Sequence, residues 1–230
     1  MKGIQRLVTV ALTMMVAASG CRESKPPAAR AASTLASHLD VMTPAAQIDT
    51  LRGLRAADST DAQIAFYAGN AYYSFGSQLE VSAPNRNAYL DSATAEYHRA
   101  VDLDSTMSKA WTNMGLAYQD AGKPDDARRA LNTAIKVNPK DALAYCHLGF
   151  LEQTAGNVSL AIDHYQSALA IDPNSAQAHY NLGLAFAEAK IFNEALIEWE
   201  TVIKLDPDGE LGKTATENVR IIKQYMTPAP

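Results

Sequence analysis

The chain has 230 residues, of which 47% are hydrophobic and 20% are charged, and its formal net charge is −5 at pH 7. This balance is typical of a folded globular protein, and it excludes a long disordered chain or a bundle of membrane-spanning helices. A negative net charge without a basic run argues against a nucleic-acid partner held through its phosphates.

The first residues, 1–20, have the pattern of an export signal. Lys2 and Arg6 precede an uncharged stretch from Leu7 to Ala18. At about 1.5 Å per residue, this stretch is too short to cross a hydrocarbon core of about 30 Å, whereas it suits the apolar region of a signal peptide. We therefore expect residues 1–20 to be a signal peptide.

The signal ends in Ala18-Ser19-Gly20-Cys21, which resembles a bacterial lipobox, although Ala18 stands where Leu is commonest. The resemblance implies that Cys21 carries acyl chains such as palmitate and becomes the first residue of the mature lipoprotein. Arg22 follows in place of the Asp that would favour inner-membrane retention, so the resemblance implies the periplasmic face of the outer membrane. An ordinary secretory signal that ends near a cysteine is the alternative interpretation.

The segment 21–40 is expected to be a flexible tether, because it includes RESKPPAARAAS and shows no apolar period. Residues 41–60 are expected to form an N-terminal helix or a degenerate half-repeat, since Ile48, Leu51 and Leu54 recur at helical intervals.

From residue 111 onward the chain repeats one pattern every 34 residues. The copies contain NMGLAYQDAGKPDDA from Asn113, HLGFLEQTAGNVSLA from His147 and NLGLAFAEAKIFNEA from Asn181. The recurring positions are Trp111, Met114, Gly115, Tyr118, Ala127, Leu131, Ala134 and Pro139, then Tyr145, Leu148, Gly149, Glu152, Ala161, Tyr165, Ala168 and Pro173, then His179, Leu182, Gly183, Phe186, Ala195, Trp199, Val202 and Pro207.

The spacing within each copy predicts two packed helices. In the first copy, positions 111, 114, 115 and 118 lie on one stripe of a helix, and positions 127, 131 and 134 lie on one stripe of a second helix. The small residues Gly115 and Ala127 allow the two backbones to approach closely. A proline stops each second helix, and Asp141 and Ser175 are expected to cap the helices that follow.

These residues resemble the tetratricopeptide repeat (TPR), with Glu152 and His179 as the clearest departures. The resemblance implies an all-α TPR solenoid of antiparallel helix pairs, a right-handed superhelix with a concave groove. The repeats are expected at 108–141, 142–175 and 176–209, followed by a capping helix at 210–226 with Leu211, Ala215, Ile222 and Tyr225 on one side.

An earlier repeat is expected at 62–107 with an insertion near 77–90, because its two halves lie twelve residues further apart than in the other copies. A tolerated loop and a partner-contacting edge are both open interpretations of the insertion.

The TPR register implies which side chains face the groove and bind a partner. The candidates are Phe66, Asn70, Tyr73, Lys109, Asn113, Leu116, Phe150, Tyr180 and Leu184. A mixture of apolar side chains and amides with few charges suits an amphipathic helix or an extended peptide, although packing between repeats is the alternative role at each position. Phe66 and Thr112 occupy positions where a carboxylate-clamping TPR has basic or polar residues, so no such clamp is predicted.

Catalysis finds no support in the sequence. None of the five histidines has metal-site spacing to a cysteine or to another histidine, and no phosphate-cradling glycine loop is present. Cys146 and His147 are neighbours on a helix and point about 100° apart, so they are poorly placed as a nucleophile and base. We therefore expect no enzyme activity, no metal and no cofactor. Cys146 is either a buried small hydrophobe or a reactive thiol.

The expected function is that of a membrane-anchored adaptor that binds a protein partner, as a peptide or helix, in the TPR groove. Lipoproteins of this plan resemble the pilotins that assist assembly of pilus secretins. The alternative is a scaffold that recruits cell-wall hydrolases or proteases to the membrane.

Overall fold

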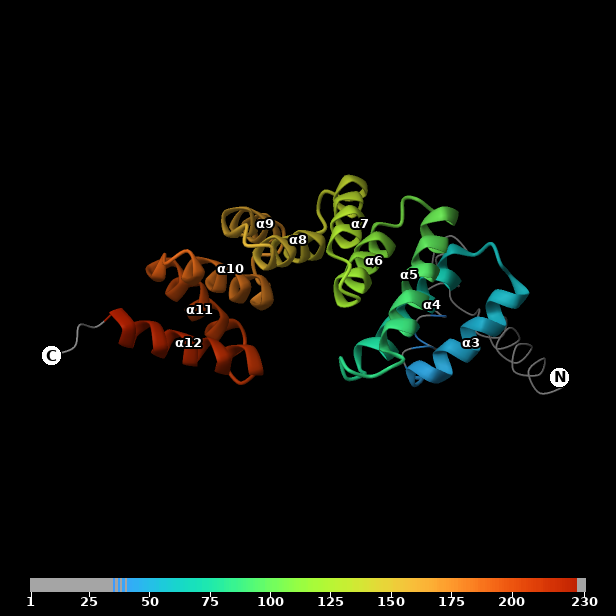
Figure 1. Cartoon of the computed structure of the whole chain (residues 1–230), viewed down its shortest axis with the longest axis horizontal. Coiled ribbons are helices and arrows are strands. Elements are labelled where there is room, and N and C mark those ends of the chain that lie inside the picture. Colours follow the sequence, from blue (N-terminus) through green and yellow to red (C-terminus); the bar gives the residue numbers. More distant parts are fainter. Residues whose placement is uncertain (1–34, 36, 38, 40, 227–230) are drawn as a thin grey trace, which may run out of the picture. The chain divides into compact units, whose positions relative to one another are not determined.

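The computed structural model describes residues 35, 37, 39 and 41–226, and these form ten α-helices and no β-strand (Figure 1). The expected signal peptide at 1–20, Cys21 and most of the expected tether lie outside the described residues. The chain divides into two compact units, residues 1–110 and 111–230. Within the described part of the chain, no helix combines the length and apolar character that a membrane span requires.

The first unit is built from α3 (Pro44–Ala57), α4 (Ala62–Ser77) and α5 (Arg86–Leu103). Helices α4 and α5 form its central pair, and the ring of Tyr97, fully buried, lies against Gly69. A methyl group on Gly69 would stand 2.5 Å from Cε1 of that ring, so the pair can pack only around a glycine. Ile48 and Leu51 of α3 are buried in the same unit.

The inserted residues of the first repeat are divided between helix and loop. Only residues 78–85 lie between α4 and α5, whereas the corresponding connection in the next repeat is residues 121–123. The remaining added length extends both helices, to 16 residues in α4 and 18 in α5. The ring of Phe75 contacts that of Tyr89 at 4.4 Å across the base of this loop. The insertion is therefore a longer helical hairpin and not only a longer loop.

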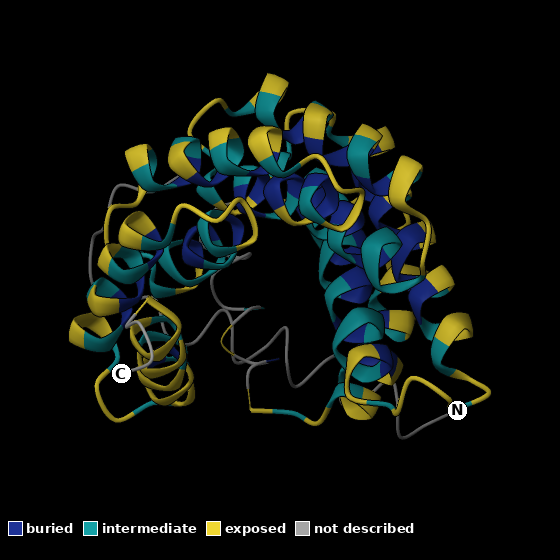
Figure 2. Ribbon diagram, turned by 60° about the vertical axis from the view of Figure 1, so that its left-hand side comes forward, coloured by how far each residue is buried: buried dark blue, intermediate teal, exposed yellow. Residues whose placement is uncertain are grey.

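The second unit continues the helix pairs. Its helices are α6 (Ser108–Asp120, from Trp111 on), α7 (Pro124–Val137), α8 (Ala142–Thr154), α9 (Val158–Ile171), α10 (Ala176–Glu188), α11 (Phe192–Leu205) and α12 (Glu210–Met226). We call α6, α8 and α10 the first helices of their repeats, and α7, α9 and α11 the second helices. Figure 2 shows the buried residues gathered where helices pack against one another.

Two helices of the second unit begin at the N-caps that the sequence predicts. The side chain of Asp141 accepts a hydrogen bond from the backbone N–H of Ala144 at 3.0 Å, and Ser175 accepts from Ala178 at 3.3 Å, so both predicted N-caps are confirmed. Helix α7 ends at Val137, where the next residue turns to extended backbone ahead of Pro139.

The predicted close approach at the glycines is also confirmed. A Cβ atom on the first-helix glycine would lie 2.5–2.6 Å from a side-chain atom of the second helix in every repeat of the second unit. The pairs are Gly115 with Leu131, Gly149 with Tyr165, and Gly183 with Trp199. The large residue of the second helix therefore fills the space that the glycine leaves.

Helix α12 carries polar residues at the positions where the other first helices carry their repeat signature. One repeat length after the signature positions of α10, this helix carries Lys213, Thr216, Glu217 and Arg220, which offer no apolar seat for another second helix. Ala215 is buried against α11, as the sequence predicts. Tyr225 differs from the expectation: it is 73% exposed, although its ring meets Phe192 edge-on at 5.4 Å.

Candidate functional site: the face of the first helices

The first helices of the second unit share a face on which α8 exposes large apolar side chains. Leu143 and Phe150 lie seven residues apart on α8, so they point to the same side of that helix. Leu143 is 49% exposed and Phe150 is 41% exposed. Burying such side chains against a partner is favourable, at about 25 cal/mol per Å² of apolar surface.

Polar contacts between successive helices define the borders of this face. His147 Nδ1 lies 3.2 Å from Gln119 Oε1 of α6, and Asn181 Nδ2 of α10 lies 3.7 Å from Cys146 Sγ. Gln153 Nε2 donates to Glu188 Oε2 at 3.0 Å.

These contacts join α8 to α6 on one side and to α10 on the other, and Phe150 lies between them on α8. His147 points toward α6, while Cys146 and Gln153 point toward α10. Leu143 and Phe150 occupy the stripe of α8 between the two directions and remain exposed. We call this surface the first-helix face, defined by Leu143, His147, Phe150, Gln153, Asn181 and Glu188.

Tyr180 and Leu184, which the sequence assigns to the same groove, are half-buried. Both pack against the cluster that includes Trp199 of α11 and Ala215 of α12. The hydroxyl of Tyr180 accepts a hydrogen bond from Asn218 Nδ2 at 3.4 Å. Their apolar surface is therefore partly used by the fold, which corresponds to the packing alternative.

On α6, Leu116 is half-buried and packs against the cluster of α7 and α8 that includes Leu131 and Leu148. Asn113 is half-buried in the same helix, and Lys109, at its start, is exposed. Leu116 is therefore partly a core residue, whereas Lys109 presents its charge to solvent.

The remaining three candidates lie on α4 of the first unit. Phe66 is half-buried, and its ring centroid lies 6.2 Å from that of Tyr97. Asn70 Oδ1 accepts a hydrogen bond from the Tyr97 hydroxyl at 2.8 Å. Tyr73 is also half-buried. Phe66 and Asn70 thus both contact the residue that holds α4 to α5.

Burial shifts the pKa values of both Cys146 and His147 toward the uncharged form. Loss of hydration lowers the pKa of His147 to about 4, against a weaker opposing effect of Asp120 and Asp141, so the imidazole is neutral at pH 7. Burial raises the pKa of the Cys146 thiol, and the hydrogen bond from Asn181 only partly offsets this. A neutral imidazole beside a protonated thiol is a poor nucleophile–base pair.

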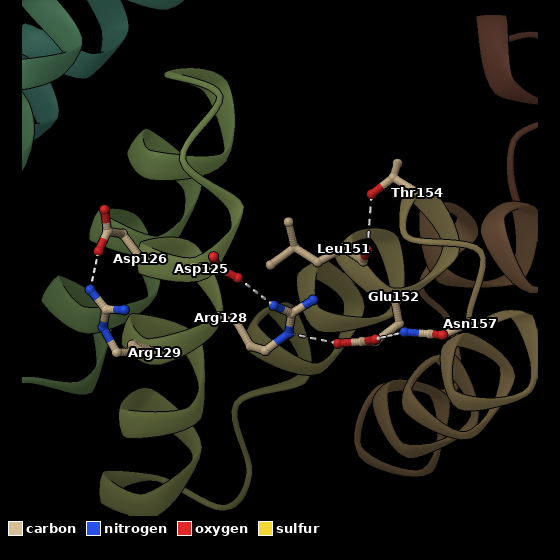
Figure 3. A network of polar contacts seen from close by, with 8 residues as sticks. All are labelled: Asp125, Asp126, Arg128, Arg129, Leu151, Glu152, Thr154 and Asn157. Carbon is tan, nitrogen blue, oxygen red and sulfur yellow. Dashed lines mark hydrogen bonds and ion pairs between the residues drawn. The ribbon is translucent and has the colours of Figure 1, made fainter.

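The departure from the repeat signature at Glu152 is a buried polar network (Figure 3). Glu152 is 5% exposed; Arg128 Nε donates to its Oε1 at 2.8 Å and Asn157 Nδ2 donates to its Oε2 at 2.7 Å. Arg128 also pairs with Asp125 at 3.1 Å, while Arg129 pairs with Asp126 nearby. Sequence reasoning missed Arg128, although an acid at an aromatic position is a signal that a basic partner exists.

The second departure, His179, is likewise paired. Its Nδ1 lies 2.5 Å from Glu198 Oε2 of α11, and its Nε2 lies 3.0 Å from the backbone oxygen of Pro173. Both departures therefore replace apolar packing by polar contacts that join neighbouring helices.

Within the described ranges, no three His, Cys, Asp or Glu side chains gather in a way that could hold a metal ion. The ion pairs among the described residues of the second unit join acids to arginine, histidine or lysine. Chemically, the first-helix face offers apolar contact and hydrogen bonding.

Comparison with protein families identifies the repeat. The tetratricopeptide repeat model matches residues 112–176 and 148–210. The two matches overlap and together span residues 112–210. None of the curated proteins matches this chain.

Solved structures of three different proteins share the fold. MamA from Desulfovibrio magneticus RS-1 has a TM-score of 0.62 at 17% identity, covering 80% of this chain and 98% of that one. YrrB, a TPR protein with an unusual peptide-binding site, has a TM-score of 0.58 at 20% identity, covering 81% and 88%. The first TPR of Spaghetti (RPAP3), bound to the HSP90 peptide SRMEEVD, has a TM-score of 0.50 at 21% identity, covering 54% and 95%.

The repeat match and the structural neighbours agree with the helix pairs described above. The fold is an all-α TPR solenoid, and the tetratricopeptide repeat model matches its residues 112–210.

Proposed function

We propose that this protein is an adaptor that captures a segment of a partner protein on the first-helix face of its second unit. The observation that carries the proposal is the exposure of Leu143 and Phe150 on α8, between contacts that fix α8 to both neighbouring first helices. Exposed apolar anchors on helices that are already folded bind a partner at a lower ordering cost than a disordered segment would.

Two of the structural neighbours favour this assignment. YrrB has a peptide-binding site, and the Spaghetti structure is a complex with an HSP90 peptide. The same fold therefore supports peptide capture in other proteins. An amphipathic helix or an extended segment would satisfy the mixture of apolar and amide side chains on the face.

Site-specific photocrosslinking tests the proposal directly. A photoreactive phenylalanine at Phe150 should form adducts with a partner in cells, whereas the same group at Ile197, 61% exposed on the second helix α11, should not. Phe150→Ala should weaken the captured complex by about 30-fold if Phe150 is an anchor worth about 2 kcal/mol. Equal adducts at both positions, or none at Phe150, would refute capture on this face.

The membrane anchor is a second part of the proposal. A lipidated Cys21 would hold the adaptor at the periplasmic face of the outer membrane, where assembly of a pilus secretin is the specific role we propose. Cys21→Ser should move the protein from the membrane fraction to the soluble fraction. Deletion of the gene should leave secretin monomers, and normal secretin multimers in the deletion strain would exclude the pilotin role.

A further inference from the structure

Helices α8, α9 and α10 contain no lysine or arginine, and Lys140 and Lys190 flank the segment that they span. From Asp141 to Ala189 the sequence contains no Lys and no Arg over 49 residues, although the chain has 20 such residues. The same segment contains five acidic residues. It spans the whole of α8, α9 and α10, so the charge of these helices is negative or neutral throughout.

One carboxylate of α8 and α10 is presented to solvent. These two helices contain only two charged residues, and Glu152 is buried in its ion pair with Arg128. The other, Glu188, is exposed, and its Oε2 accepts one hydrogen bond from Gln153. Glu188 is the last residue of α10, where the helix dipole adds negative potential.

The apolar anchor and this carboxylate are close together in the structure. Phe150 lies three residues before Gln153 on α8, which places the two side chains on adjacent turns of one side. Gln153 in turn reaches Glu188 at 3.0 Å. When one side chain of a bound segment covers Phe150, a nearby side chain of the same segment therefore lies beside Glu188.

We propose that the segment captured on the first-helix face is cationic and amphipathic, with apolar side chains on Leu143 and Phe150 and a Lys or Arg on Glu188. This inference rests on the proposed function, because it names the chemistry of the partner that the same face takes. An acidic segment or a terminal carboxylate finds no cation on α8 or α10 and meets the charge of Glu188. The HSP90 peptide SRMEEVD in the Spaghetti complex belongs to the acidic class that this face rejects.

Two synthetic peptides test the charge preference. They are fluorescent 14-residue helices with the same leucines and one tryptophan, one with lysines on the polar side and the other with glutamates. The protein is the chain with Cys21→Ser. The lysine peptide should bind and the glutamate peptide should not, and binding of the lysine peptide should weaken as salt rises from 50 to 300 mM. Equal binding of the two peptides contradicts the inference.

Matched variants separate a specific contact from general attraction to an acidic protein. Glu188→Gln should weaken the lysine peptide by about fivefold, the effect of a contact worth about 1 kcal/mol. Asp163→Asn removes the same charge at an exposed residue of the second helix α9 and should leave affinity unchanged. Equal losses in both variants would mean non-specific adsorption and would overturn the inference.

Photocrosslinking in cells distinguishes this inference from the proposed function. If Phe150 adducts form and Glu188→Lys lowers their yield, both the proposed function and the cationic partner are supported. If the adducts form and Glu188→Lys changes nothing, capture on this face stands and the cationic partner is wrong. If Phe150 forms no adduct in the parent chain, the proposed function itself fails, whatever the peptides show.

Discussion

Arg128 of α7 and Glu152 of α8 form an ion pair, with 2.8 Å between Nε and Oε1. Glu152 holds the repeat position at which the neighbouring repeats carry Tyr118 and Phe186. Burial raises the pKa of Glu152, but the hydrogen bonds from Asn157 and Arg128 outweigh it, so the pKa of Glu152 lies below its ordinary value. The carboxylate is therefore charged at neutral pH, and it depends on its partners.

Arg128→Ala is expected to destabilise the second unit by about 1–3 kcal/mol, because it takes away the charged partner of a buried carboxylate and leaves the hydrogen bond from Asn157. Arg128 is itself a third exposed, which keeps the cost below that of a fully buried pair. Urea unfolding followed by the fluorescence of Trp111 and Trp199 measures the change.

Two further variants check that mechanism. Arg129, the residue after Arg128, forms an exposed ion pair with Asp126. Arg129→Ala removes that pair and should lower the free energy of unfolding by less than about 0.5 kcal/mol. Combining Arg128→Ala with Glu152→Phe restores the aromatic residue of the next repeat and should recover most of the loss. A double variant less stable than Arg128→Ala alone would contradict this account.

The helix pairs were predictable because their determinants are local. A proline two residues after each second helix, a cap before the next first helix and a glycine opposite a large residue all recur at fixed spacing, and each acts within one repeat. The structure confirms these contacts, for example between Gly149 and Tyr165.

The exposure of individual groove candidates was less predictable because it depends on neighbouring helices. Phe150 and Leu184 hold the same position in successive repeats, yet Phe150 is exposed and Leu184 packs against the cluster of α11 and α12. Arg128 lies 24 residues before Glu152, so its role follows from the packing of α7 on α8 and not from helical spacing.

Gly149→Ala is expected to destabilise the second unit by about 1–3 kcal/mol, because the new methyl group would lie 2.6 Å from Cε1 of Tyr165 and force the two helices apart. Gly53→Ala in α3 is the control: no atom lies within 4 Å of its added Cβ, so helix propensity should stabilise the first unit by about 0.5–1 kcal/mol. Thermal unfolding by circular dichroism gives both values. A stabilised Gly149→Ala would show that the helices are not seated on this glycine.

The stability of the second unit is expected to fall as the pH drops from about 6.5 to about 4. Burial lowers the pKa of His147 to about 4 in the folded protein, below the ordinary value of 6.5, so the unfolded chain binds more protons in this window. The stability is therefore complete above pH 6.5 and declines by about 3 kcal/mol as the pH reaches 4, from a pKa difference of about 2.5 units.

His147→Gln provides the control for this pH dependence. The amide keeps a donor toward Gln119 but does not titrate, so the decline between pH 6.5 and 4 should become shallower by most of that amount. Urea midpoints at pH 7 and pH 4.5 measure the slope for both proteins. An unchanged slope in His147→Gln would assign the acid sensitivity to other groups, such as Glu152.

Cys146 is expected to react with a thiol reagent only when the second unit opens. Its side chain is buried at 8% exposure, and burial raises the pKa of the thiol, so both access and thiolate fraction are low in the folded protein. In the chain with Cys21→Ser, Cys146 is the remaining cysteine, and its labelling by a chromogenic disulfide at pH 8 should be slow and become fast in urea.

Asn181→Ala removes the hydrogen bond to Sγ at 3.7 Å and leaves space beside the thiol, so labelling of the native protein should accelerate. Rapid labelling of the parent protein without urea would instead mean that the contact between α8 and α10 opens readily, and with it one border of the first-helix face.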